Sequence, residues 1–328
     1  MGVSASSDPA TLSSDYHRII CSHRQLRWAT TFNATMIPVL RLLTTLGMLV
    51  GAIPSSVSAQ TGVDDPLLAR GEYVFRISGC SHCHTTENGA QLAGGRALVT
   101  PFGTFYTPNI TSHQTAGIGA WSVDDFQRAL HQGVSPDGSD YYPAFPYTSY
   151  TGIRAEDVRA LYAYIFTLPA SEQANRDHEL AWFLQWRVAA WAWKWLFFNA
   201  GEFQQQAGQS EQWNRGAYLA EAMGHCAECH TPRDIFGALS ADLAYAGNAQ
   251  GPEDELVPNI TSHDTGIGDW SRTDLLEFLQ FGELPDGEYA AGSMDPVIEG
   301  IRHLTPEDRD ALTDYLRALP PIDNRVSG

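Results

Sequence analysis

The chain has 328 residues, enough for two domains of ordinary size with a segment to spare. Its 38 acidic residues outnumber its 20 basic ones, the formal net charge is −18, and Lys194 is its single lysine. This charge argues against nucleic acid and against an anionic membrane surface as partners, and it favours steering toward a basic docking face.

Residues 1–59 are predicted to be an N-terminal extension and signal peptide that is removed. An apolar run at 37–53 precedes Val-Ser-Ala at 57–59, which fits a signal-peptidase site and would leave Gln60 at the start of the mature chain. The 35 residues before Met36 are long, polar and serine-rich for a signal peptide, so we expect translation to start at Met36. The apolar run is short for a membrane span, and we therefore expect export.

Residues 80–84 have the sequence Cys-Ser-His-Cys-His, the attachment pattern of a c-type haem. The spacing places Cys80 and Cys83 on one side of a helical turn, where each thiol can form a thioether with a haem vinyl group. His84 then becomes the proximal ligand of the iron. Half of a zinc site and a redox dithiol are the alternatives, but zinc needs a second pair of ligands nearby, and a redox pair needs no histidine.

The pattern occurs again as Cys-Ala-Glu-Cys-His at 226–230. Cys226, Cys229 and His230 match the three residues of the first motif. Two matches inside two copies of a longer repeat are far stronger support than one match. The sequence therefore predicts two covalently bound haem c groups, with His84 and His230 as proximal ligands. Attachment of haem to reduced cysteines also fits export, because in bacteria it takes place in the periplasm.

The two motifs lie in two copies of one repeat. Pro-Asn-Ile-Thr-Ser-His occurs at 108–113 and at 258–263, and Gly-Ile-Gly-x-Trp-Ser occurs at 117–122 and at 266–271. The predicted divisions are a removed segment at 1–59, a first domain at 60–170, a linker at 171–212 and a second domain at 213–328.

Each copy has three helix signals. The first helix leads to the motif from Arg-Gly-x-Tyr at 70–73 or 215–218. The second begins at a capping box and ends at glycine, from Ser122 to Gly133 or from Ser271 to Gly282. The third runs from Glu156 to Pro169 or from Thr305 to Pro320. No stretch alternates with period two over a useful length, so the predicted fold is all-α: two tandem class I-type cytochrome c domains joined by an aromatic-rich linker helix.

Residues 179–203 carry five tryptophans, at positions 182, 186, 191, 193 and 195. We interpret this segment as a linker helix packed against both domains. The alternative is a docking face for a partner subunit or a membrane interface, since tryptophan is enriched in both. Arg187 and Lys194 argue against a helix that spans a membrane.

Met294 is the predicted sixth ligand of the second haem, because it lies in the loop after the second helix, where a class I-type cytochrome presents its methionine. Met223 precedes Cys226 on the proximal side. The position 149 residues before Met294 is Phe145, which cannot donate to iron, so we expect the first haem to be five-coordinate. The weaker candidates for its sixth ligand are His82, His113, His131, His178, Tyr141, Tyr142 and Tyr147.

Several stretches resemble the cytochrome c subunits of periplasm-facing bacterial dehydrogenases, such as alcohol and gluconate dehydrogenases. They are Thr-Pro-Phe-Gly-Thr at 100–104, Pro-Asn-Ile-Thr at 108–111, Gly-Ile-Gly at 117–119, Trp-Asn-Arg-Gly-Ala-Tyr-Leu at 213–219 and Cys-His-Thr-Pro-Arg at 229–233. In this family the position of Phe145 is normally methionine. Many members have three haems and a C-terminal membrane anchor, whereas this chain ends at Gly328 after two motifs, so membrane contact is expected to be peripheral or through a partner.

The resemblance implies a periplasmic electron-transfer protein that is not itself an enzyme. It would relay electrons from a dehydrogenase subunit of flavin, quinone or molybdenum type to a respiratory acceptor. The alternative is a dihaem enzyme with an open first haem, such as a peroxidase. Thiosulfate oxidation is a further case, but outside 1–59 no cysteine remains beyond the four motif cysteines.

Overall fold

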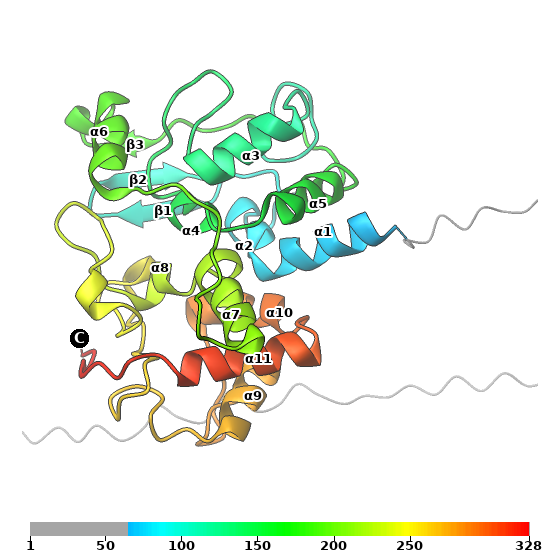
Figure 1. Cartoon of the computed structure of the whole chain (residues 1–328). Helices are drawn as coiled ribbons and strands as arrows, with labels where there is room; N and C mark the ends of the chain where they lie inside the picture. The colour runs from blue at the N-terminus through cyan, green and yellow to red at the C-terminus, as the bar shows by residue number, and fades with distance from the viewer. Residues whose placement is uncertain (1–64, 328) are drawn as a thin grey trace, which may run out of the picture. The chain divides into compact units, whose positions relative to one another are not determined.

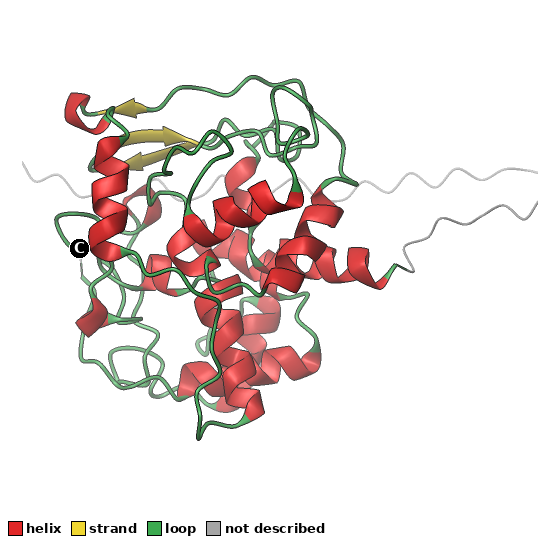
Figure 2. Ribbon diagram, turned by 45° about the horizontal axis from the view of Figure 1, so that its top comes forward, coloured by secondary structure: helices red, strands yellow, loops and turns green. Residues whose placement is uncertain are grey.

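A computed structural model describes residues 65–327 (Figure 1). The predicted signal peptide and its Cys21 lie outside these residues. Helices joined by irregular segments form most of the described chain, with one small sheet (Figure 2). None of these helices combines the length and the apolar character that crossing a membrane requires.

The helices follow the repeat seen in the sequence. The first copy contains α1 (Pro66–Ile77), α2 (Cys80–His84), α3 (Val123–Gln132), α4 (Tyr147–Tyr150) and α5 (Ala155–Ile165). The segment between the copies contains η1 (Trp182–Leu184) and α6 (Val188–Phe197). The second copy contains α7 (Glu211–Tyr218), the π-helical η2 (Leu219–Met223), α8 (Ala227–His230), η3 (Ala241–Leu243), η4 (Pro252–Asp254), α9 (Arg272–Phe281), η5 (Gly292–Met294), α10 (Asp295–Ile301) and α11 (Pro306–Arg317).

The predicted capping signals of α3 and α9 are confirmed. Ser122 and Ser271 are the N-caps, and each forms a capping box with the aspartate three residues later. Gly133 and Gly282 end these helices in the left-handed conformation, with φ of 61° and 76°. The third helices, α5 and α11, stop three to four residues before the predicted prolines.

The predicted all-α class holds only in part, because three short strands form an antiparallel sheet. The strands β1 (Ala97–Thr100) and β2 (Gly103–Tyr106) form a hairpin, and β3 (Glu179–Leu180) pairs with the other edge of β2. Strands of two to four residues are too short to give a clear period-two signal. Pairing with β3 also depends on Gly103, which has a φ of 121° and where a Cβ would lie 2.3 Å from the carbonyl oxygen of Glu179.

Each copy is built on a close crossing of its first and last helices, α1 with α5 and α7 with α11. The crossing points are Gly71 and Gly216. A Cβ at either glycine would lie 2.0 Å from a carbonyl oxygen of the partner helix, that of Ala160 or Ala311. The repeated Arg-Gly-x-Tyr motif is therefore explained, because only glycine allows this approach.

One extra residue distinguishes the two copies ahead of the cysteine motif. Cys80 follows Tyr73 by seven residues, whereas Cys226 follows Tyr218 by eight. The second copy accommodates the extra residue in the π-helical turn η2, which has no counterpart in α1. In both copies the chain then reaches the first cysteine through a residue with positive φ, Gly79 or His225.

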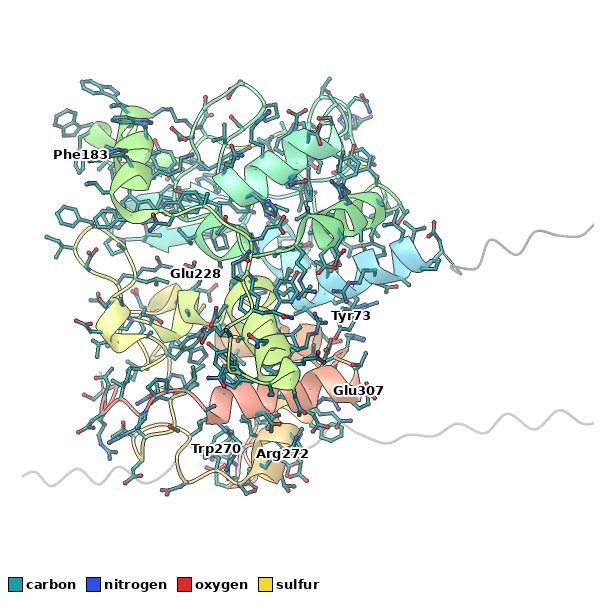
Figure 3. The ribbon with its side chains drawn as sticks, in the orientation of Figure 1. Tyr73, Phe183, Glu228, Trp270, Arg272 and Glu307 are labelled. Atoms are coloured by element: carbon teal, nitrogen blue, oxygen red, sulfur yellow. The ribbon has the colours of Figure 1, made fainter. Side chains whose placement is uncertain are left out.

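The two copies pack directly on each other and share one apolar core. In the first copy, Arg70 makes an ion pair with buried Asp157, with 2.6 Å between Nε and Oδ1, and Tyr218 of the second copy donates its hydroxyl to the same carboxylate at 2.6 Å. The second copy repeats the arrangement with Asp308, Arg215 and, from the first copy, Tyr73 (Figure 3 labels Tyr73). We refer to these groups as the Asp157 cluster and the Asp308 cluster. Each copy thus contributes a tyrosine to the ion pair of the other.

Candidate functional site

The first cysteine motif forms the single turn α2, directly after α1. Gly79 precedes it in the left-handed conformation, with a φ of 63°, and turns the chain into the motif. Cys80 and Cys83 are partly exposed. Burial nevertheless raises the pKa of the Cys80 thiol to about 12, and burial does the same for Cys226 in the second motif. A redox dithiol needs a lowered thiol pKa, so the surroundings of these cysteines do not favour that alternative.

The motif histidines have a defined tautomer. Nδ1 of His84 lies 2.7 Å from the carbonyl oxygen of Pro108, and Nδ1 of His230 lies 2.8 Å from that of Pro258. A carbonyl oxygen only accepts hydrogen bonds, so each Nδ1 carries the ring hydrogen and each Nε2 keeps its lone pair. A histidine that binds a metal through Nε2 needs this arrangement.

The repeated Pro-Asn-Ile-Thr segment holds these carbonyl groups in place. The side chain of Asn109 donates to the carbonyl oxygens of Ser171 and Gln173, and its Oδ1 accepts hydrogen bonds from the amide and hydroxyl of Thr111. Asn259 forms the corresponding bonds to Thr261 and Ile322 in the second copy. The conformation of this turn, and with it the tautomer of the motif histidine, is therefore fixed by buried side-chain hydrogen bonds.

The loops after α3 and α9 have matching hydrogen bonds. The amide of Tyr141 donates to the carbonyl of Gly133 at 2.8 Å, and the amide of Ala290 donates to that of Gly282 at 2.8 Å. These pairs are 149 residues apart. Four residues later, with the same offset, come Phe145 and Met294, and both pack partly buried against the core. The structure therefore places Phe145 at the position that Met294 occupies in the second copy.

Residues 68–169 match the family model described as Cytochrome c. The chain is also 38% identical over 260 residues to the diheme cytochrome c-type protein of Cereibacter sphaeroides. The aligned residues cover 78% of this chain and 86% of that protein. The chain belongs to the cytochrome c family.

Two further relatives of this cytochrome are subunits of larger assemblies by name. The gluconate 2-dehydrogenase cytochrome c subunit of Pantoea cypripedii is 39% identical over 289 residues, or 85% of this chain and 65% of that subunit. The cytochrome c subunit of the quinone alcohol dehydrogenase of Gluconobacter oxydans is 33% identical over 293 residues, or 86% of this chain and 60% of that subunit. This chain thus spans somewhat less than two thirds of either subunit. The matches confirm the resemblance seen in the sequence and identify an electron-transfer protein rather than an enzyme.

A cytochrome c carries covalently bound haem c, and the residues present fit that group. Each motif offers two thiols on one helical turn and an imidazole whose Nε2 is free. Bound haem would supply an iron that cycles between two oxidation states. The role of the chain is to hold the group, supply axial ligands and control access of water.

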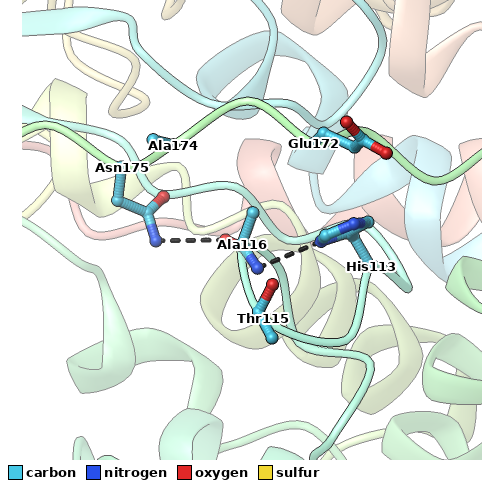
Figure 4. Close-up of a pocket in the computed structure, with 6 residues that line it drawn as sticks. All are labelled: His113, Thr115, Ala116, Glu172, Ala174 and Asn175. Carbon is cyan, nitrogen blue, oxygen red and sulfur yellow. Dashed lines mark hydrogen bonds between the residues drawn. The ribbon is translucent and has the colours of Figure 1, made fainter.

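Two of the weaker candidates for the sixth ligand of the first haem have the wrong tautomer. Nδ1 of His113, a residue that lines a pocket, accepts a hydrogen bond from the amide of Ala116 at 3.1 Å (Figure 4). Nδ1 of His178 accepts one from the amide of Tyr106 at 3.1 Å. In the neutral ring the hydrogen is therefore on Nε2, where a ligand needs a lone pair. His263, the counterpart of His113, accepts an amide in the same way.

Of the remaining candidates, His82 and Tyr142 are engaged elsewhere and Tyr141 and Tyr147 keep their protons, whereas Nε2 of His131 is buried without a hydrogen-bond partner among the described residues. Arg96 contacts both ring nitrogens of His82 at 2.9 and 3.0 Å. His131 lies in the last turn of α3. The hydroxyl of Tyr142 donates to the carbonyl of Leu184. Burial raises the pKa of Tyr141 to about 12, and it also raises that of Tyr147, so neither phenol ionises readily to the phenolate that iron prefers.

Sequence reasoning missed Glu228, which lies inside the second motif. This carboxylate is buried, makes an ion pair with Arg233 at 2.5 Å, and accepts the hydroxyls of Thr148 at 2.6 Å and Ser149 at 2.9 Å (Figure 3). Burial alone would raise the pKa of Glu228, but Arg233 and the hydroxyl donors lower it overall. Thr148 and Ser149 belong to α4, so Glu228 connects the second motif to the first copy three to four residues after Phe145.

The tryptophan-rich segment is a shorter helix than predicted, and it contacts both copies. Lys194 donates to the carbonyl of Gln132, and the indole of Trp193 donates to that of Phe236 in the second copy. Phe183 of η1 lies at the outer edge of the molecule (Figure 3). More than half exposed are Trp182, Phe183, Trp186, Val188, Trp191, Trp195 and Leu196. The segment therefore contacts both copies, as the linker interpretation expects, and it also has an exposed aromatic surface.

Proposed function

We propose that this cytochrome carries two haem c groups and relays electrons from a periplasmic dehydrogenase subunit to a respiratory acceptor. The observation that carries the proposal is the pair of motifs whose histidines both direct Nδ1 to a proline carbonyl, at 2.7 and 2.8 Å. Two metal-competent histidines, each beside two attachment thiols, are the requirement for two haems. Each copy then corresponds to a class I-type domain, at 60–170 and 213–328.

The first haem is attached at Cys80 and Cys83 with His84 as its proximal ligand. The second is attached at Cys226 and Cys229, with His230 proximal and Met294 as its sixth ligand. The position of Met294 after the matching loop supports that assignment. Phe145 stands at the equivalent position of the first copy, so the first haem lacks a methionine ligand. Its iron should bind carbon monoxide when reduced and should have the lower potential, because the thioether that favours the ferrous state is absent.

A dehydrogenase partner is supported by the names of the relatives, which include cytochrome subunits of gluconate, alcohol and fructose dehydrogenases. We infer a partner of flavin, quinone or molybdenum type and a location in the periplasm. The acidic charge of the chain, near −20 once residues 1–59 are removed, favours a basic docking face on that partner.

Haem content and ligation test the proposal on the purified secreted chain. A pyridine haemochrome assay should give two haems per chain, and one haem in the Cys226→Ala, Cys229→Ala double variant. Met294→Ala should abolish the thioether-to-iron charge-transfer band, whereas Phe145→Met should add a second such band and abolish carbon monoxide binding. Two low-spin haems that both refuse carbon monoxide in the unmodified chain would contradict the vacant first haem.

The partner assignment needs a separate test. The chain should be reduced by substrate in the presence of the dehydrogenase subunit encoded beside it, and the two should purify as a complex. Failure of every dehydrogenase of the host to reduce the oxidised protein would refute the relay, even if two haems are present. A complete relay also requires reoxidation by a terminal oxidase fraction from the same cells.

A further inference from the structure

His225 has an unfavourable backbone conformation directly before Cys226. Its φ is 40°, and its counterpart in the first copy, directly before Cys80, is Gly79 with a φ of 63°. The left-handed region is open to glycine and costs free energy for a residue with a Cβ. The second copy thus places a histidine where the same turn accepts glycine in the first. A strained residue of this kind persists only where its side chain or its surroundings require it.

The side chain of His225 lies between the two copies. Its ring packs edge-on against Tyr150 of α4, with 5.2 Å between centroids and an interplanar angle of 69°, and its Nδ1 is 3.2 Å from the carbonyl of Met223. Tyr150 is 8% exposed and donates its hydroxyl to the carbonyl of Ser78 at 2.9 Å. Its ring also contacts Phe145, with 5.9 Å between centroids. Tyr150 therefore contacts the segment before each cysteine motif, through Ser78 and His225, and it also contacts Phe145.

A second anchor holds the same helix. Glu228 accepts the hydroxyls of Thr148 and Ser149, the two residues before Tyr150. These hydrogen bonds to a buried carboxylate explain why Glu228 is placed there. They do not explain His225, which forms no ion pair within the described residues and keeps a strained backbone. What His225 adds is a rigid ring that fixes how closely the segment leading to Cys226 approaches Tyr150.

We propose that His225 is a positioning residue that sets the separation and mutual orientation of the two haem groups through its contact with Tyr150. The inference rests on the proposed attachment of one haem at each motif. Each haem is tethered through the cysteines that follow Ser78 and His225 in the chain. A shift of one segment relative to the other therefore shifts the two haem planes, and with them the electronic and electrostatic interaction between the haems.

The test uses the full secreted protein with both haems attached. His225→Gly should fold at least as well as the unmodified chain, because glycine removes the strain at a φ of 40°. It should retain two haems and the ligation of each. It should lose the bisignate exciton signal that two fixed, neighbouring haems give in the circular dichroism of the Soret band, and the separation of the two midpoint potentials should change.

Three variants separate positioning from general weakening of the interface. His225→Asn tolerates the left-handed backbone but lacks the ring, so it should behave as His225→Gly does. Tyr150→Phe keeps the ring and should retain most of the exciton signal. Tyr73→Phe removes a bond between the copies that involves neither motif, and it should leave the signal unchanged although it lowers the melting temperature.

The inference is overturned if His225→Gly has the exciton signal and potentials of the unmodified protein. It is also overturned if these change only together with haem loss or a lower melting temperature, which would indicate a structural role, or with a change of spin state, which would indicate an iron ligand. An unmodified dihaem protein without an exciton signal would overturn it as well. Finding one haem per chain would instead refute the proposed function, so the two failures are distinguishable.

Discussion

Replacing Tyr218 by phenylalanine tests how strongly the two copies depend on each other. Tyr218 is fully buried, and its hydroxyl donates to Oδ2 of Asp157 at 2.6 Å and accepts the amide of Arg154 at 3.0 Å. Phenylalanine keeps the ring and its packing and removes both hydrogen bonds. Asp157 keeps its two bonds to Arg70, at 2.6 and 2.9 Å, so the carboxylate remains paired.

The expected loss is the sum of two effects. A hydrogen bond to a charged group contributes about 1.5 to 3 kcal/mol, and an amide left without a partner costs about 1 kcal/mol more. We therefore expect Tyr218→Phe to lower the free energy of unfolding by roughly 2.5 to 4 kcal/mol. For a chain of this size, 1 kcal/mol corresponds to about 2 to 4 °C, so the melting temperature should fall by roughly 5 to 15 °C.

Tyr73→Phe is the matched control in the Asp308 cluster. Tyr73 is only partly buried, so water can replace part of the hydrogen bond that its hydroxyl donates to Asp308. The free energy of unfolding should therefore fall by less than in Tyr218→Phe, by about 1 to 2 kcal/mol. Urea unfolding followed by far-ultraviolet circular dichroism, with both haems attached, measures both variants. A change below about 0.5 kcal/mol in Tyr218→Phe, or a larger loss in Tyr73→Phe, would refute this reasoning.

Three further predictions concern the crossing of helices, acid stability and the aromatic surface. Gly216→Ala should cost about 3 kcal/mol or more in thermal unfolding, because its Cβ would lie 2.0 Å from the carbonyl oxygen of Ala311; a loss under 1 kcal/mol would contradict this close approach. Burial alone would raise the pKa of Asp308, but hydrogen bonds, first that from Arg215, lower it overall below 3.8. The stability that ionised Asp308 contributes is present above the unfolded pKa and is lost as pH falls from about 4 through the lower folded pKa. Melting curves of Asp308→Asn should therefore show a lower melting temperature at pH 7 and a smaller decrease of that temperature on acidification. Trp195→Ser, at a side chain that is 75% exposed, should change the free energy of unfolding by no more than about 0.5 kcal/mol; a larger loss would show that the aromatic surface supports the fold.

The elements that local sequence specifies were predicted well. Ser122 and Ser271 begin helices and Gly133 and Gly282 end them, because a cap depends on residues within one turn. The cysteine motifs form helical turns for the same reason. The pairing of β2 with β3 was missed because β3 lies more than 70 residues after β2, and a pairing of so few residues is decided by tertiary contacts.

The motif residues, the repeat and the family follow from the sequence alone, since residue identity and spacing determine them, and the sequence also predicts that Phe145 stands where the second copy has Met294. Only the tertiary structure decided which ring nitrogen of His84 is free, because the carbonyl that sets the tautomer belongs to Pro108, 24 residues away. It also decided that Glu228 and His225 contact α4 of the other copy. The physical reason is that hydrogen bonds and ring contacts depend on distance in space, which spacing along the chain specifies only within a helical turn.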